Sequence, residues 1–183
     1  MEREEALVEL KKHVKNKNLL KHMYACEAVM RMLAGHFGED ADKWGLAGLL
    51  HDIDYDETKD DPLRHSKVGA EMLLKLGLPE DIVYAVKVHN SAHGLPRESL
   101  MDKALYATDP VTGLIVAGAL IRPQKKLAAV DVPFLVNRFN EKSFARGANR
   151  EQIACCAELG MELEEFLSIS LQAMQDSSGE LGL

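Results

Sequence analysis

The chain has 183 residues, of which 46% are hydrophobic and 28% charged, and its formal net charge at pH 7 is −7. This length and composition are ordinary for one packed globular domain. The negative charge argues against a general affinity for nucleic-acid backbones or anionic membranes, so we expect neither a nucleic-acid duplex nor a membrane as a partner.

The N-terminal segment and the cysteines favour a cytoplasmic location. Residues 1–10 are charged and amphipathic and lack the apolar core of a secretion signal. The longest apolar run, residues 111–121, is shorter than the roughly 18 residues that a membrane helix needs. The cysteines at positions 26, 155 and 156 do not form a pattern typical of a disulfide framework.

The helical elements follow from composition and from start and stop signals. Alanine, leucine, glutamate, lysine and methionine dominate and no β-branched alternation persists, so we predict an all-α fold. Asp40 or Asp42 and Asn149 are typical N-caps, Pro79 is a typical helix start, and Gly77 is a typical helix end. The predicted helices span residues 2–14, 19–36, 42–52, 64–76, 79–89, 98–120, 132–140, 149–158 and 162–175.

Three regions depart from this regular pattern. Residues 54–63 contain several aspartates and a proline and are predicted to form an acidic loop. The long region 98–120 is either one continuous helix or is broken near Asp109–Pro110, because a proline disfavours helix at the residue before it. Residues 177–183 are predicted to be a frayed tail.

Side chains that can bind metal interrupt the apolar segments of these helices. His51 and Asp52 end one apolar run, and a neutral imidazole beside a carboxylate offers a metal one nitrogen and one oxygen ligand. Such polar groups are costly at the end of a buried helix unless a partner satisfies them. Residues of the same kind end or interrupt other segments, at His22, His65, His89 and Asp109. Their recurrence indicates one shared site.

The order of these residues resembles the HD-domain superfamily of metal-dependent phosphohydrolases. His22, the pair His51–Asp52 and Asp109 follow its ligand order, and residues 65–74 resemble the segment after the pair in HDIG-type members. The fourth residue of that signature is Asp54 here, not glycine. The resemblance covers about residues 19–122 and implies a compact HD-domain-like helical bundle with a C-terminal helical extension.

We therefore expect four segments within one domain. They are an N-terminal helix (1–18), an HD-type metal-binding core (19–122), a C-terminal helical extension of the same domain (123–176) and a flexible tail (177–183).

The resemblance implies that His22, His51, Asp52 and Asp109 ligate a divalent transition metal. A mixed set of nitrogen and oxygen ligands suits zinc, iron, manganese, nickel or cobalt, and the sequence does not separate them. Each coordinating histidine must be neutral, with its other ring nitrogen held by a hydrogen-bond acceptor.

A second ion is an open alternative. In related two-metal members, histidines stand at the positions of His65 and His89, and often a further one at the position of Asn90. With a single ion, His65 and His89 would instead contact the substrate phosphate. His93 lies one helical turn after His89, a spacing at which it could share a ligand if the helix continued.

Other charged residues are weaker candidates. Asp54 follows the metal pair directly and is either part of a solvated loop or a residue that supports catalysis as an orienting group or a general base. Cationic side chains that could hold a phosphate are Lys67, Arg122 and Arg146.

These expectations define a function and two alternatives. We predict a metal-dependent phosphomonoesterase or phosphodiesterase that acts on a nucleotide or another small phosphate ester through a metal-activated water, with His51 and Asp52 at its centre. The ligand order extended by His65 and His89 also resembles HD-type diiron oxygenases such as inositol oxygenase. The second alternative is a non-catalytic module that binds a nucleotide or a partner. The sequence leaves the oligomeric state open.

Overall fold

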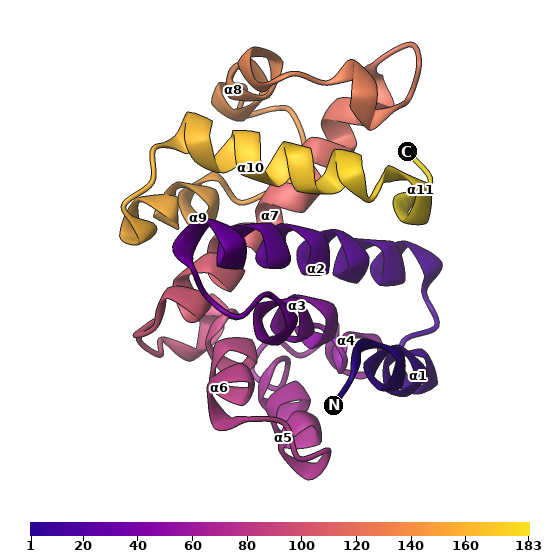
Figure 1. The fold of residues 1–183 in the computed structure, drawn as a ribbon, viewed down its shortest axis with the longest axis vertical. Coiled ribbons are helices and arrows are strands. Elements are labelled where there is room, and N and C mark those ends of the chain that lie inside the picture. Colours follow the sequence, from indigo (N-terminus) through magenta and orange to yellow (C-terminus); the bar gives the residue numbers. More distant parts are fainter.

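The chain folds into helices without any strand, which confirms the all-α prediction (Figure 1). The computed structural model describes all residues, 1–183. The α-helices are α1 (Arg3–His13), α2 (Lys17–Phe37), α3 (Ala41–Leu50), α4 (Tyr55–Thr58), α5 (Lys67–Lys75), α6 (Glu80–Val88), α7 (Leu100–Ile121), α8 (Val132–Asn140), α9 (Arg150–Ala154), α10 (Leu163–Asp176) and α11 (Ser178–Leu181). Short 3-10 helices lie at η1 (Ser91–His93), η2 (Leu127–Ala129) and η3 (Cys155–Leu159).

Helix α2 lies at the centre of the bundle. It runs across the molecule between α10 and α3, and α7 passes behind α10 and α2 (Figure 1). The packing of α3 on α2 depends on Gly48, where an added Cβ would come within 2.7 Å of the backbone oxygen of Cys26. Glycine at this position lets the two backbones approach, and this approach brings the end of α3 to the side of α2.

One apolar core runs through the whole chain, from Ala6 in α1 to Leu181 in α11. The C-terminal helices contribute to it directly, because α10 packs against α2, α7 and α8. Phe166 in α10 is fully buried. The segments predicted beyond residue 122 are thus continuous with the core by packing, while the division of the chain into four segments stays a prediction.

Helix α7 continues without a break through Pro110. A proline has no backbone N–H, so the carbonyl of Tyr106, four residues earlier, loses its helical partner. The side-chain amide of Gln152 in α9 donates to that carbonyl at 2.9 Å. The continuous alternative is therefore correct, and a side chain distant in sequence replaces the missing hydrogen bond.

Helix α7 is also long and apolar enough to cross a membrane, judged by length and composition alone. Within the protein, 61% of its most apolar window is buried. A buried core helix of a globular domain passes the same test, so this property is weak evidence for a membrane span.

Three local predictions differ from the structure. The acidic segment 54–63 was expected to be a loop but contains α4. The helix predicted from residue 64 begins only at Lys67, because Ser66 adopts a left-handed φ of 66°, which a right-handed helix cannot include. The tail 177–183, expected to be frayed, contains α11 and buries Leu181, which is 2% exposed. Contacts made by the folded chain override local propensity in each case.

Both ends of the chain are fastened to α2 by Arg3. Its guanidinium donates to both carboxylate oxygens of Glu27 in α2, at 2.6 and 2.9 Å. The same group donates to Glu180 in α11 at 3.1 Å. Glu27 is buried, so this bidentate pair satisfies a carboxylate that would otherwise be desolvated without a full set of partners.

Candidate metal centre

Four ligand atoms converge where α2, the end of α3 and α7 meet; we call His22, His51, Asp52 and Asp109 the first ligand group. The Nε2 atoms of His22 and His51 are 3.2 Å apart, and Asp109 Oδ1 lies 3.2 Å from His22 Nε2. Asp52 Oδ2 lies 3.5 Å from His51 Nε2. Tetrahedral ligands at about 2.1 Å from a common ion are spaced about 3.4 Å apart, so these separations fit one metal.

Hydrogen bonds on the far side of each ring turn these nitrogens toward the group. His51 Nδ1 donates to the carbonyl of Gly48 at 2.8 Å. His22 Nδ1 lies 3.0 Å from Thr112 Oγ1, and that hydroxyl donates onward to the carbonyl of Asp109. Thr112 therefore accepts from His22, and both Nε2 atoms present lone pairs.

The first ligand group thus requires a positive charge. Two nitrogen lone pairs and two carboxylates face one another at hydrogen-bond distance, an arrangement that is repulsive without a cation. A proton can supply it: burial disfavours charged His22, but Cys26 and Asp109 raise its pKa above the usual value. A metal ion can supply it as well, and the ligand types and spacings fit that role.

Asp52 also contributes to a second ligand group, formed by Asp52, His65 and His89. Its other oxygen, Oδ1, lies 3.3 Å from His65 Nε2 and 3.4 Å from His89 Nε2. His89 Nδ1 donates to the carbonyl of Val86 at 2.6 Å, so its Nε2 is also a free acceptor. One carboxylate therefore faces two sets of nitrogen ligands, one with each oxygen.

Asp54 lies directly behind His65. Its carboxylate is fully buried and its Oδ1 lies 3.2 Å from His65 Nδ1. Its Oδ2 accepts from the backbone N–H groups of Ser66 and Gly69, at 2.8 and 3.0 Å. Asp54 thus both caps the start of α5 and orients His65. These contacts occupy both of its carboxylate oxygens.

The loop that carries His65 is held by further polar contacts. His93 Nε2 lies 2.8 Å from the carbonyl of His65 and 3.0 Å from Ser66 Oγ. Asn90 donates to the carbonyls of Pro62 and His65 at 2.7 and 3.1 Å. Neither Asn90 nor His93 joins a ligand group; both position the loop that supplies His65.

Burial and neighbouring charges set the protonation of the shared site. Burial lowers the pKa of His51 to about 4, which keeps it neutral as a ligand must be. Burial disfavours the carboxylate of Asp52, yet His51, His65 and His89 hold its pKa well below the usual value. Burial also disfavours charged His65, but hydrogen bonds with Asp52 and Asp54 raise its pKa to about 10. His65 must therefore release a proton to coordinate a metal.

Cys26 lies at this site but is not among the site residues predicted from the sequence. Its buried thiol lies 3.8 Å from His22 Nε2 and 3.9 Å from Thr112 Oγ1. His22, Cys26 and His51 have donor atoms close enough together to hold an ion. The i, i+4 spacing of Cys26 from His22 on α2 was the available signal, because residues so spaced share a helix face.

The three predicted phosphate-binding residues make no hydrogen bond or ion pair with either ligand group, so their role stays a prediction. Lys67 lines a surface hollow between α5 and α6. Arg122 pairs with Asp131 at 3.6 Å, and thirteen residues of helix separate it from Asp109, about 20 Å at 1.5 Å per residue. Arg146 lines a separate hollow before α9.

Known proteins are similar to this chain over the part that contains the two ligand groups. A family model described as "HD domain" matches residues 19–119. The chain is 32% identical over 96 residues to Ribonuclease Y of Lawsonia intracellularis, which covers 52% of this chain and 18% of the relative. It is 28% identical over 137 residues to Ribonuclease Y of Desulfotalea psychrophila, covering 73% and 26%. The chain thus spans about a fifth to a quarter of the length of these relatives. No solved structure matches it significantly.

Proposed function

The chain belongs to the HD domain family, and from this premise we propose that it is a metal-dependent phosphohydrolase with two metal ions at its centre. The family and the relatives support a hydrolase in general. The observation that carries the finer proposal is Asp52, because its Oδ2 faces the first ligand group and its Oδ1 faces the second. A carboxylate placed in this way would hold one ion with each oxygen, which suits the chemistry of two-metal hydrolases.

Bound divalent ions would supply Lewis acidity for a phosphoryl oxygen and would lower the pKa of a nucleophilic water. The residues of this chain provide the fixed frame for that chemistry. His51 and His89 are buried and are locked by bonds from Nδ1 to backbone carbonyls. His22 and Asp109 have side chains that are 24% and 31% exposed, so we infer that substrate reaches the centre on their side.

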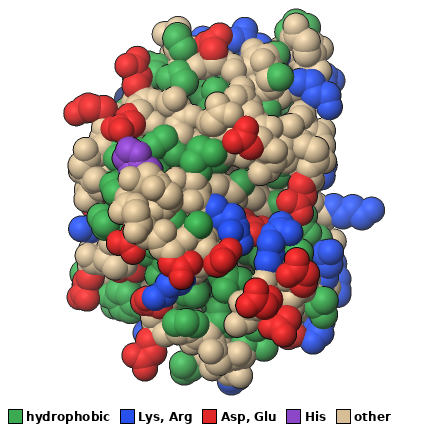
Figure 2. Space-filling view, in the orientation of Figure 1, with side chains coloured by type: hydrophobic (Ala, Val, Ile, Leu, Met, Phe, Trp, Pro, Cys, Tyr) green, Lys and Arg blue, Asp and Glu red, His purple; other side chains and the backbone are tan.

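For the substrate, we propose a nucleotide or another small phosphate ester. Cleavage of an RNA phosphodiester is the second candidate, because the relatives are named Ribonuclease Y. The charges argue for the smaller substrate: the net charge is −7, and acidic and basic side chains alternate on the face in Figure 2 without a continuous basic surface. RNA binding depends largely on such basic surfaces.

A phosphate-release assay tests the proposal. Protein stripped of metal and reconstituted with Mn²⁺ or Zn²⁺ should release inorganic phosphate from a panel of esters without oxygen, and elemental analysis should find close to two ions per chain. Turnover that occurs only with iron and oxygen would instead assign the chain to the oxygenases. Tight nucleotide binding without turnover under any metal would indicate a binding module.

Cleavage of a single-stranded RNA oligonucleotide, with the small esters left intact, would favour the second candidate. A single ion per chain under metal-replete conditions would leave the hydrolase assignment standing but would contradict the second ion.

A further inference from the structure

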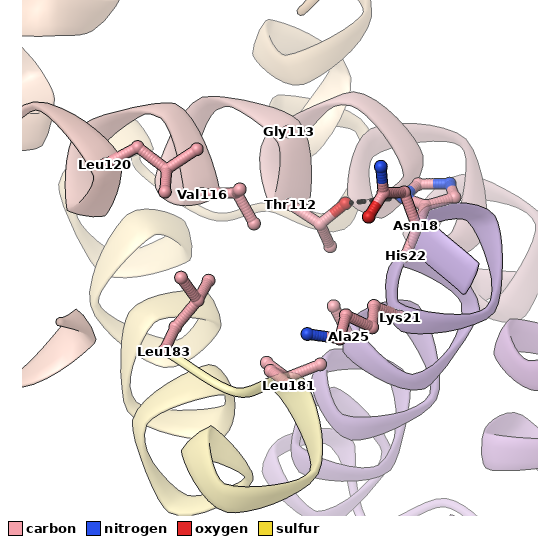
Figure 3. Close-up of a pocket in the computed structure, with 10 residues that line it drawn as sticks. All are labelled: Asn18, Lys21, His22, Ala25, Thr112, Gly113, Val116, Leu120, Leu181 and Leu183. Carbon is pink, nitrogen blue, oxygen red and sulfur yellow. Dashed lines mark hydrogen bonds between the residues drawn. The ribbon is translucent and has the colours of Figure 1, made fainter. Parts of the chain in front are cut away.

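A cavity of about 450 Å³ opens between α2 and α7, next to the first ligand group. Figure 3 shows side chains from both helices and from the end of the chain pointing into it. Volumes of this size are typical of sites for small organic molecules. His22 and Thr112 form its inner end, so the cavity begins at a predicted metal ligand and at the hydroxyl that orients it.

The far part of the cavity is aliphatic. Its walls are Ala25 of α2, Val116 and Leu120 of α7, and Leu181 and Leu183 at the C-terminal end. No aromatic side chain lines it. A nucleobase is usually held by stacking on aromatic rings, and this part of the cavity offers no ring for it.

One face of α7 connects the two ends of the cavity. Asp109, Gly113, Val116 and Leu120 follow one another at helical spacing, so the ligand carboxylate and the aliphatic wall lie on the same side of the helix. Gly113 lies midway, and a Cβ added there would meet no atom within 4 Å. Glycine thus leaves an open passage from the metal site to the aliphatic wall.

A positive charge lines the same cavity. Lys21 lies on its α2 side, and Figure 3 shows its ammonium directed into the space. The lysines that form ion pairs are Lys12 and Lys43, so Lys21 is not neutralised by a carboxylate. An apolar cavity with one unpaired cation at its side favours an amphiphilic anion over a neutral hydrocarbon.

We propose that this cavity binds the organic group of the substrate and that this group is an aliphatic chain, so that the preferred substrates are aliphatic phosphate monoesters. The inference rests on the proposed function, because it places the phosphate at the ligand groups while the chain passes over Gly113. Burial of methylene groups against the aliphatic wall would provide the selectivity.

Calorimetric binding of two non-hydrolysable probes, hexylphosphonate and methylphosphonate, tests the cavity without turnover. The wild-type protein should bind hexylphosphonate at least about ten-fold more tightly, because several methylenes become buried. Gly113→Leu fills the passage, so the ratio of the affinities for hexylphosphonate and methylphosphonate should fall to near one. Gly35→Leu is the matched control, since Gly35 is also an exposed helical glycine with no atom within 4 Å of an added Cβ; it should keep the preference.

The outcomes separate this inference from the proposed function. Equal binding of the two probes, or an unchanged preference in a folded Gly113→Leu variant, would overturn the cavity assignment. Phosphate release that depends on Asp52 but not on chain length would overturn it too, and the hydrolase would stand. A chain-length preference in binding without phosphate release from any ester would support the cavity and contradict the hydrolase.

Discussion

The two ligand groups share Asp52 but are positioned by different means. The residues of the first group lie on or directly after long helices, and their geometry depends on how closely α2, α3 and α7 pack. His65 of the second group precedes a helix. Its ring nitrogen Nδ1 bonds to Asp54 Oδ1, and its carbonyl accepts from His93. Backbone packing therefore positions the first group, and a polar network positions His65 of the second group.

This difference predicts which variants affect which half. Substitutions at the interface of α2 and α3 should disturb stability and the first group together. Substitutions in the polar network should weaken the second group while the fold and the first group persist. Asp52, which faces both groups, should affect both.

The largest effect is expected for Asp52→Ala, which removes a ligand atom from each group. Metal content should fall to near zero and phosphate release should drop about a thousand-fold or more, because the metal contributes several kcal/mol to the barrier reduction. Elemental analysis and the phosphate assay measure these changes. Asp56→Ala is the control, because Asp56 lies four residues later, in α4, and accepts from the backbone N–H of Lys15. Full metal occupancy in Asp52→Ala would contradict the shared role.

Gly48→Ala should test the packed half. The added Cβ would lie 2.7 Å from the backbone oxygen of Cys26, which cannot move without shifting α2. We expect a loss of about 3 kcal/mol in the free energy of unfolding, measured with urea, at the upper end for overpacking. Gly35→Ala, where the added Cβ meets nothing, should instead stabilise by about 0.5–1 kcal/mol. Equal stability of the two variants would show that the close approach is not required.

Asp54→Asn should test the polar half. Asparagine offers one acceptor oxygen where Asp54 uses two, so either His65 or the start of α5 loses its partner. Metal affinity of the second group should fall about 10–100-fold, while the first group keeps its ion. Metal titration against a competing chelator measures both steps. Asp60→Asn, an exposed residue of the same segment, is the control; a loss of both ions in Asp54→Asn would refute the separation.

The smallest effect is expected for Gln152→Ala, which leaves the carbonyl of Tyr106 without its donor beside Pro110. Unfolding free energy should fall by about 1–2 kcal/mol, the usual cost of an unsatisfied buried acceptor. Pro110→Ala restores a backbone N–H, so it should recover part of this loss in the double variant but not add to it. Urea denaturation of the wild type, the two single variants and the double variant gives the coupling energy between Gln152 and Pro110. If the losses in unfolding free energy of the two single variants simply add, Gln152 does not replace the hydrogen bond that Pro110 removes.

The sequence predicted the elements whose signals are local. Asp40 and Asn149 cap their helices as expected, each accepting from two backbone N–H groups. The order of metal-capable residues also predicted which side chains the fold gathers, because each one ends or interrupts an apolar segment. What these residues bind and how many ions they hold stay predictions.

The differences arise where the deciding partner is distant in sequence. The continuity of α7 depends on Gln152, 46 residues from Tyr106. The late start of α5 depends on the left-handed Ser66, which Asp54 and Lys87 fix through hydrogen bonds. The sequence does not distinguish Asp54 from the other aspartates of its segment. The fold shows that its carboxylate is buried behind His65.

The contacts of Arg3 couple the local unfolding of the first and last helices. One guanidinium joins α1 and α11 to Glu27 of α2, across a sequence separation of 177 residues. Release of α1 removes a partner of Glu180, and release of α11 returns part of Arg3 to solvent, so each end lowers the cost of freeing the other. We expect their amide protons to exchange with solvent as one cooperative unit, and Arg3→Met should uncouple their exchange rates.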